Sequence, residues 1–404
     1  MALADLEALA LANNPTLVQS AAQIQAAQGA ARQAGLFPNP VVGYDGEFNN
    51  ISNAANETWS GGFVQQEIVT GGKLRLSRAK WCQRVRIART NYHAQQHRVL
   101  NDVRIQFYRT LAAQRMVDIA SQLLENGEDN LQTHREMLNV GQTNQPGLLR
   151  AEVDFQRDRL SLRQAENELT HAWALLSSAV GVPGLAESTL TASLEPESAP
   201  LDWETALSQV LASSPELQAA RQRIRQHQIT VQRERVEPIP NLLAGVATIH
   251  SSDADTTQTT VNLGFPIPVF DRNQGTVRQA MADLRQSHAE LRRLELELRN
   301  RLATSFRDYR TAWLKVQDYQ SEMLPKAEHA YDLLHNSYKT RRAAWPDVLM
   351  AQRFHLQLVS EQITNLRMYR ESDVLVRGML LTGGLQTPPG PVGAGHIDAV
   401  AKPR

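Results

Sequence analysis

Residues 13–40, NNPTLVQSAAQIQAAQGAARQAGLFPNP, return in altered form at residues 213–240, SSPELQAARQRIRQHQITVQRERVEPIP. The offset of 200 residues persists far along the chain, and prolines and apolar residues recur at it. The matched pairs are Pro15 and Pro215, Leu17 and Leu217, Ile24 and Ile224, Pro38 and Pro238, Pro40 and Pro240, Pro146 and Pro346, Leu149 and Leu349, and Ala151 and Ala351. One constant offset indicates a tandem repeat, which we place at residues 1–195 and 200–385. The Pro- and Gly-containing residues 386–404 are expected to form a disordered tail.

The overall composition excludes several classes of protein. The 404 residues carry 42 Lys+Arg and 42 Asp+Glu, so the chain lacks the net basic charge of a general nucleic-acid binder. Cys82 is the single cysteine, which excludes a disulfide framework and a cysteine-rich metal site. No run of 18 apolar residues predicts a transmembrane helix. Residues 1–14, MALADLEALALANN, are expected to form a helix rather than a secretory signal, which fits either a cytosolic protein or a mature exported one.

Each repeat predicts the same series of helices. The first helix (4–34 and 203–236) is broken by a proline near its start, and the last (148–180 and 347–381) follows a proline-containing turn. Between them, heptad-like apolar spacing predicts long helices over 74–140 and 274–340, which we expect to be unbroken. A helix of about 65 residues spans about 100 Å, far more than the radius of about 22 Å of a compact globule of this size. Two shorter helices stacked end to end would match its length.

Four short runs of alternating residues predict strands, two in each repeat. They lie at 42–48, 59–64, 243–249 and 261–267, and polar loops separate them. Their lengths approach those of tilted strands that cross a bilayer. Four strands cannot close a barrel, and an open sheet edge is not tolerated in lipid. Three chains would together supply twelve strands, enough for a barrel with a lumen. A soluble four-stranded sheet beside a helical bundle explains the pattern equally well.

Several motifs resemble one family. The opening ALALANNPTL (8–17), the hairpin entry GLFPNPVVGYDGE (35–47), the Gly71-Gly72-Lys73 exit and PIPVFDRNQG (266–275) resemble the TolC-like outer-membrane efflux proteins, most of all their heavy-metal branch. The resemblance implies a mainly α homotrimer with a shared 12-stranded transmembrane β-barrel and a long helical tunnel. It implies a place in the outer membrane of a Gram-negative-type cell, among its lipids, with the tunnel extending into the periplasm. A periplasmic adaptor and an inner-membrane RND-type transporter are the implied partners.

The resemblance also implies a periplasmic gate at the helix-turn tip of the second repeat. Tyr338 and Asp347 match family positions, while Arg341 stands where glycine is usual and Met350 where a second aspartate is usual. Tyr338, Arg341, Arg342 and Asp347 are therefore the gate candidates. The helix-turn tips would include Gly141, Pro146 and Pro346. The implied junction between barrel and tunnel contains Pro38, Pro40, Gly71, Gly72, Pro238, Pro240, Pro266, Pro268 and Gly275.

Simpler explanations exist for these residues. Asp347 could serve only as an acidic residue in a first helical turn, and Tyr338 could serve only in packing. His93 and His97 lie four residues apart without a third ligand, and His250 with Asp253 and Asp255 fits an exposed loop, so we predict no metal site and no cofactor.

The sequence supports more than one function but no catalysis. No phosphate-binding loop, nucleophile elbow or Cys/His pair is present, so an enzyme is not expected. We predict a passive, gated exit duct of a tripartite efflux pump. The alternatives are a soluble helical scaffold or coiled-coil adaptor without a pore, and an exit duct for type I secretion. The cargo could be a metal cation, a drug-like molecule or a protein.

Overall fold

The computed structural model describes residues 1–48, 58–196, 199–252 and 254–390. The described chain forms two compact units, each of which takes segments from both repeats. The sheet unit contains Gln19–Tyr92, Pro215–Glu295 and the described residues from Pro388 onward. The tip unit contains Met1–Val18, His93–Ser214 and Leu296–Thr387. The repeat boundaries and the disordered tail remain predictions, and residues 391–404 of that tail lie outside the described residues.

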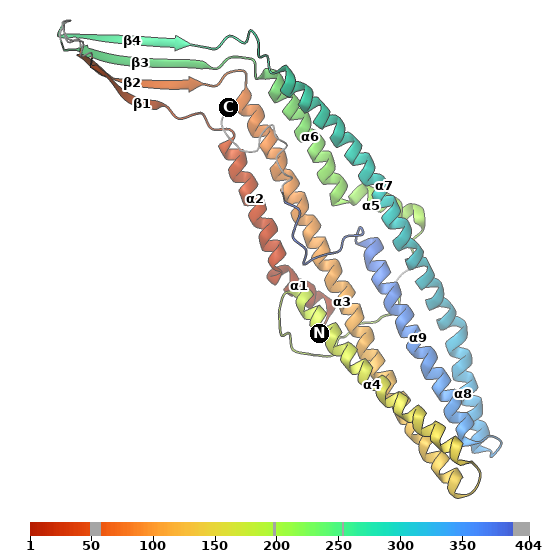
Figure 1. The fold of residues 1–404 in the computed structure, drawn as a ribbon. Coiled ribbons are helices and arrows are strands. Elements are labelled where there is room, and N and C mark those ends of the chain that lie inside the picture. The colour runs from red at the N-terminus through yellow and green to blue at the C-terminus, as the bar shows by residue number, and fades with distance from the viewer. Residues whose placement is uncertain (49–57, 197–198, 253, 391–404) are drawn as a thin grey trace. The chain divides into compact units, whose positions relative to one another are not determined.

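The strands of both repeats join in one antiparallel sheet in the sheet unit. They are β1 (Val41–Phe48), β2 (Thr58–Ile68), β3 (Leu242–Ser251) and β4 (Thr256–Gly264), and Figure 1 shows them in the order β1-β2-β3-β4. The central β2–β3 pairing, with Gly61 opposite Ile249, therefore links one repeat to the other. β1 and β4 are the two edge strands.

The last strand differs from its prediction. We expected it over 261–267, but β4 begins earlier and ends at Gly264, which pairs with Leu243. Pro266 has no N–H to donate to a ladder, so the alternating residues that follow Gly264 remain outside the sheet. The polar residues from Thr256 onward, expected in a loop, instead begin the strand.

The two faces of the sheet differ in chemistry. In-register pairing places Val42, Val64, Val246 and Val261 on one face, together with Tyr44 and Leu263, and we call it the apolar face. Its described residues include no Asp, Glu, Lys or Arg. The opposite face, called the mixed face, carries Asp45, Gln65, Gln258 and Asn262 beside Phe63 and Ile249. The apolar face is open to solvent within one chain, as the 72% exposure of Tyr44 shows.

The helices of the first repeat follow the prediction closely. They are α1 (Leu3–Asn13), α2 (Pro15–Gln33), α3 (Lys73–Asn139) and α4 (Gln145–Val180). The break between α1 and α2 occurs where expected, because Pro15 cannot continue the hydrogen-bond pattern of α1. The Asn14 carboxamide closes the break by accepting the Thr16 N–H at 3.0 Å. α3 is unbroken over 67 residues.

In the second repeat the long helix is interrupted, contrary to expectation. The elements are α5 (Trp203–Ser213), α6 (Pro215–Val236), α7 (Gln274–Asp318), a π-helical turn η1 (Tyr319–Met323), α8 (Leu324–Lys339) and α9 (Trp345–Arg377). Our expectation of one unbroken helix over 274–340 is wrong because it overlooked Pro325. Proline lacks the N–H that would bond four residues back, and the widened π turn accommodates this loss.

The last helix also ends earlier than expected, at Arg377 instead of residue 381. The Asn101 side chain on α3 donates to the carbonyls of Gly378 at 2.9 Å and Leu381 at 2.8 Å. Met379 and Leu380 adopt positive φ angles of 59° each, which no helix can continue. These tertiary contacts, with a residue far away in sequence, terminate the helix.

The core of the tip unit is aromatic and aliphatic. Tyr309 and Tyr369 stack with ring centroids 5.5 Å apart, and both are almost fully buried, as is Phe107. The Tyr309 hydroxyl accepts the Leu201 N–H at 3.1 Å, so this buried polar atom is satisfied. Among the described helices, none is long and apolar enough to cross a membrane.

Candidate functional site

The α3–α4 turn of the tip unit is closed by a glycine. Gly141 has φ +74°, and the next residue, Gln142, donates its N–H to the Met137 carbonyl at 2.8 Å. These two features define the Schellman type of helix end. The residue in the left-handed conformation turns the chain so that N–H groups beyond the helix bond to its last carbonyls. α4 then begins with the Asn144 side chain accepting the Gly147 N–H at 3.0 Å and with Pro146 in the first turn.

The α8–α9 turn repeats this geometry without a glycine. Arg341 occupies the left-handed position with φ +57°, and Arg342 donates its N–H to the Ser337 carbonyl at 2.8 Å. Pro346 lies in the first turn of α9, and an Asp347 carboxylate oxygen accepts the Ala344 N–H at 3.4 Å. Asp347 therefore does contribute to the start of its helix, as the simpler explanation proposed, and its side chain remains exposed.

The four gate candidates meet in this one turn. Tyr338 packs its ring against Trp345, with centroids 4.9 Å apart and planes at 48°, so it holds the two ends of the turn together. Arg341, Arg342 and Asp347 are exposed. In the described part of the chain, no ion pair joins Asp347 to either arginine. The turn thus presents one carboxylate and two guanidinium groups to its surroundings.

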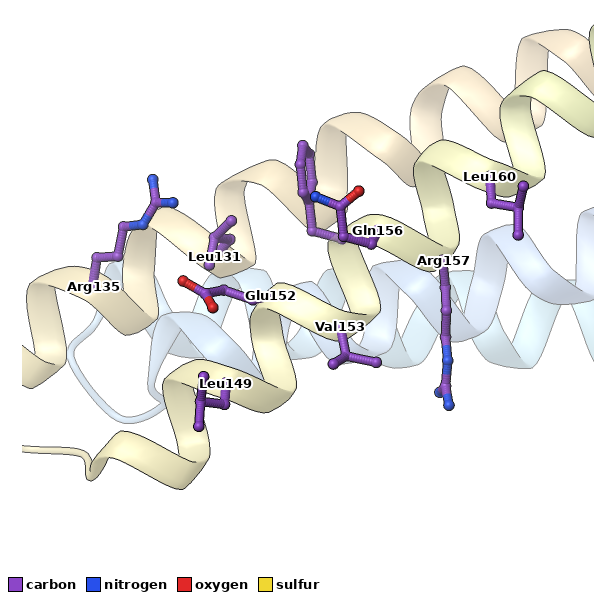
Figure 2. Close-up of a pocket in the computed structure, with 9 residues that line it drawn as sticks. Leu131, Arg135, Leu149, Glu152, Val153, Gln156, Arg157 and Leu160 are labelled. Atoms are coloured by element: carbon purple, nitrogen blue, oxygen red, sulfur yellow. The ribbon is translucent and has the colours of Figure 1, made fainter.

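A groove lies beside the first turn, between α3 and α4. Its volume is about 570 Å³, and Leu131 and Arg135 of α3 line it together with the residues of α4 that Figure 2 labels. Leu149, Val153 and Leu160 form an exposed apolar ridge along α4, and Glu152 and Arg157 flank it. An apolar groove with charged borders suits a helix of another protein.

A buried ion pair connects the two hairpins of the tip unit. Arg353 of α9 donates to both carboxylate oxygens of Asp158 on α4, at 2.6 and 2.8 Å. The Asp158 side chain is 6% exposed. Close by, Asn126 of α3 donates to the Leu349 carbonyl at 3.1 Å. Sequence analysis did not identify these residues, because polar residues are common along a helix and none of them indicates which residue of the other repeat it contacts.

The predicted junction residues gather where the sheet meets the helices of the sheet unit. Pro238, Pro240, Pro266 and Pro268 line one cavity of about 750 Å³. Pro38 accepts a hydrogen bond from the Gln66 side chain at 2.9 Å, and Pro40 directly precedes β1. Gly71 and Gly72 have φ angles of +65° and +68°, which explains a glycine pair before α3. Gly275 lies in the first turn of α7, where an added Cβ would meet no atom within 4 Å.

A polar network with buried members fixes this junction. The Lys73 ammonium donates to the Asn241 side-chain oxygen at 3.0 Å, and the Asn241 amide donates to Glu67 at 2.7 Å. Arg233 donates to the Ser77 hydroxyl at 3.0 Å and pairs with Glu237. Burial lowers the pKa of Lys73, while Glu237 opposes that shift. The sequence indicated only Lys73, as part of the Gly-Gly-Lys exit.

His93, His97 and His250, the histidines considered from the sequence, show no metal-binding geometry. His93 contacts the Gln96 side chain at 3.0 Å, and His97 is one helical turn away. His250 lies 3.2 Å from the Thr257 hydroxyl and 3.9 Å from Asp255, while Asp253 is outside the described residues. Within the residues the structure describes, no three His, Cys, Asp or Glu side chains are grouped so that they could hold a metal.

Comparisons with known proteins agree with this architecture. The family model described as outer membrane efflux protein matches residues 6–182 and again 206–372, which confirms the predicted tandem repeat. The cobalt-zinc-cadmium resistance protein CzcC of Cupriavidus metallidurans is 23% identical over 354 residues, covering 85% of this chain and 81% of CzcC.

Solved structures share the fold. The structure of CusC superposes with a TM-score of 0.77 at 17% identity, covering 94% of this chain and 92% of that one. The outer membrane protein VceC of Vibrio cholerae gives a TM-score of 0.74 at 15% identity, covering 94% and 96%. The family match also agrees with the prediction that the chain is not an enzyme, and places it in the outer membrane. The chain belongs to the outer membrane efflux protein family.

Proposed function

We propose that three copies of this chain form the exit duct of a tripartite efflux pump, with their sheets closed into one 12-stranded barrel. The observation that carries the proposal is the incomplete sheet. β1 and β4 are edge strands within one chain, and an open edge cannot persist in hydrocarbon. Pairing of β4 with β1 of the next copy removes every edge when the ring closes.

The two faces of the sheet give this barrel its orientation. The apolar face, with exposed Tyr44, Val261 and Leu263, contacts the lipid of the outer membrane. The mixed face, with Asp45, Gln65 and Asn262, lines the lumen. A soluble sheet would cover at least one face with its own helices, whereas here the apolar face stays exposed within the described chain.

The exposed turn of α8 and α9 is the periplasmic gate in this proposal. Three copies of Asp347 would bring three carboxylates to the mouth, where the guanidinium groups of Arg341 and Arg342, two for each carboxylate, oppose their charge. Tyr338 acts by holding the turn against Trp345. The α3–α4 groove of Figure 2 receives an α-helical hairpin of the periplasmic adaptor, which links the duct to an inner-membrane RND-type transporter.

The cargo is a metal cation, and it passes by gated diffusion. The likeness to a cobalt-zinc-cadmium resistance protein supports a cation. No metal-binding group occurs among the described residues, which suits a duct that must not retain its cargo. The energy for export comes from the inner-membrane partner.

Two measurements test the proposal. The mass of the protein in detergent should equal three times the 45.1 kDa of one chain, and the purified protein should conduct ions across a lipid bilayer. A monomer without conductance would favour the helical scaffold without a pore. If conductance is present, Asp347→Ala should weaken block by multivalent cations, with the exposed Glu361→Ala on the same helix as the control. Unchanged block would remove Asp347 from the gate.

A further inference from the structure

A second pocket of the tip unit lies among α3, α4 and α9, away from both helix-turn tips, and we call it the three-helix pocket. Its volume is about 620 Å³, which is in the range of sites for small organic ligands. Part of its lining is small or apolar and buried, and this part includes Ala112, Ala113, Ala172 and Ile363. The export function proposed above makes no use of this pocket.

Two arginines give the pocket a positive pole. Arg109 of α3 donates to both carboxylate oxygens of Glu371, at 3.0 and 2.9 Å, and Arg367 of α9 donates to one of the same oxygens at 2.8 Å. Both arginines line the pocket. One carboxylate balances only one of the two guanidinium charges, and no other described residue accepts a hydrogen bond from either side chain. The pair therefore keeps a positive charge and N–H donors in the geometry that suits a carboxylate.

Two acceptors give the pocket an opposite pole. Glu168 of α4 lines the pocket, and its only ion-pair partner among the described residues is His171, at 3.9 Å. Gln106, one helical turn before Arg109 on α3, also lines the pocket, and its side-chain oxygen is buried without a hydrogen-bond partner. Glu168 can accept hydrogen bonds from an ammonium group, and Gln106 can accept one from an N–H once its side chain turns towards a ligand.

The two poles belong to one site. The hydrogen bond with Glu371 raises the pKa of Arg109, and the charge of Glu168 adds to that effect, so Glu168 lies within electrostatic reach of the arginine. A simple anion beside the arginines would be repelled by Glu168, and a simple cation beside Glu168 would be repelled by the arginines. A molecule that carries both charges is attracted at each pole.

We propose that the three-helix pocket binds a zwitterion of the amino-acid or short-peptide class, with its carboxylate on Arg109 and Arg367 and its ammonium group beside Glu168. Ala112 and Ala113 follow Arg109 by three and four residues, so they lie on the same face of α3 and leave room for a side chain of the ligand. All of these residues belong to the tip unit, and the proposal does not depend on the barrel or the gate.

Peptides with and without their terminal charges test the proposal on the unaltered protein. L-alanine and L-alanyl-L-alanine are titrated into the full-length protein in detergent at neutral pH, and binding is followed by saturation-transfer NMR. We expect at least one of them to bind, and the tighter one shows whether the site takes an amino acid or a peptide. N-acetyl-alanyl-alanine lacks the ammonium group and alanyl-alanine amide lacks the carboxylate, and each loss should weaken binding of the dipeptide about tenfold.

Substitutions then locate the site. Arg367→Gln and Glu168→Gln should each weaken binding about tenfold. Arg115→Gln on α3 and Glu166→Gln on α4 remove the same charges from exposed positions that do not line the pocket, and they should leave the affinity unchanged. The proposal is overturned if neither probe binds at millimolar concentration, if blocked and free dipeptide bind equally, or if the control variants weaken binding as much as the pocket variants. None of these results would alter the mass or the conductance that tests the proposed duct.

Discussion

At the scale of single residues, Arg341 carries local backbone strain. It has the left-handed conformation that its repeat counterpart, Gly141, adopts without a Cβ penalty. An L-residue in this conformation destabilises the folded state by about 1–2 kcal/mol. A glycine avoids this strain but recovers only part of that free energy, because it gives the unfolded chain more conformational entropy. The arginine therefore lowers the stability of the tip, which agrees with a role outside folding.

Replacing Arg341 by glycine should therefore stabilise the protein. We expect Arg341→Gly to gain about 0.5–1 kcal/mol, because the left-handed strain disappears. Thermal unfolding of the purified protein measures the gain as a higher midpoint. Arg342→Gly is the matched control and should lower the midpoint, since Arg342 has no positive φ to relieve. A lower midpoint for Arg341→Gly would contradict the interpretation.

His227 on α6 should make stability depend on pH. Burial lowers its pKa in the folded protein, and the nearby Arg223, Arg84 and Lys80 lower it further against the opposing effect of Asp283. Folding therefore favours the neutral ring. The stabilisation by the neutral ring is complete above the pKa of a histidine in the unfolded chain, about 6.5. It is lost as the pH falls towards the lower pKa that His227 has in the folded protein.

The measurement is a series of thermal midpoints from neutral to mildly acidic pH. The midpoint of the unaltered protein should drop as the pH falls below about 6.5, and His227→Gln should reduce that drop. His288→Gln on α7, where the side chain is exposed, serves as the comparison. Equal acid sensitivity of the His227→Gln protein and the unaltered protein would refute the assignment.

At the scale of elements, the β2–β3 pairing depends on one glycine. A Cβ on Gly61 would meet the Thr248 carbonyl oxygen at 2.0 Å, and that backbone atom belongs to the ladder joining the two repeats. A Cβ on the neighbouring Gly62 would have only the Gly43 carbonyl oxygen within 4 Å, at 3.9 Å. The two glycines therefore form a matched pair with opposite expectations.

Gly61→Val should disrupt the sheet, whereas Gly62→Val should be tolerated. The first substitution forces β2 away from β3, and a barrel built from the sheet would not close. The yield of heat-resistant oligomer on a native gel measures the effect. Normal oligomer from Gly61→Val, or its loss from Gly62→Val as well, would show that close approach of the strands is not the cause.

The ion pair between α4 and α9 should stabilise the tip unit through tertiary contact. Asp158→Asn leaves the Arg353 guanidinium without its counter-charge in a largely buried place, which should cost about 1–3 kcal/mol. Asp154→Asn on the same helix removes an exposed partner, 3.5 Å from Arg157, and should cost less than about 0.5 kcal/mol. Thermal midpoints of the two variants give the comparison, and equal values would place Asp158–Arg353 among the weak surface pairs.

At the scale of the whole molecule, the proposed lumen predicts ion selectivity. Asp45 lies on the mixed face of β1 and would recur three times around the barrel. Asp45→Asn should reduce the preference for cations, because the carboxylates attract them at close range. The reversal potential of single channels in a salt gradient measures this preference. Gln65→Asn on the same face is the control, and an unchanged reversal potential for Asp45→Asn would place the residue outside the lumen.

Local signals explain why much of the fold could be predicted. The breaks at Pro15 and Pro215, and the ends of α4 and α6, match the expected positions to within a few residues, because proline and apolar spacing act over single turns. The candidates Tyr338, Arg341, Arg342 and Asp347 meet in one turn because they are close in sequence. Pro325 was an equally local signal that our prediction overlooked.

The sequence alone determined the tandem repeat, the class of its helices and the positions of the tips, because periodicity and turn residues depend on near neighbours. Only the tertiary structure decided the strand order, the end of α9 beside Asn101 and the partnership of Asp158 with Arg353. Those features join residues far apart along the chain, and a long-range contact depends on how the elements pack rather than on any pattern within one of them.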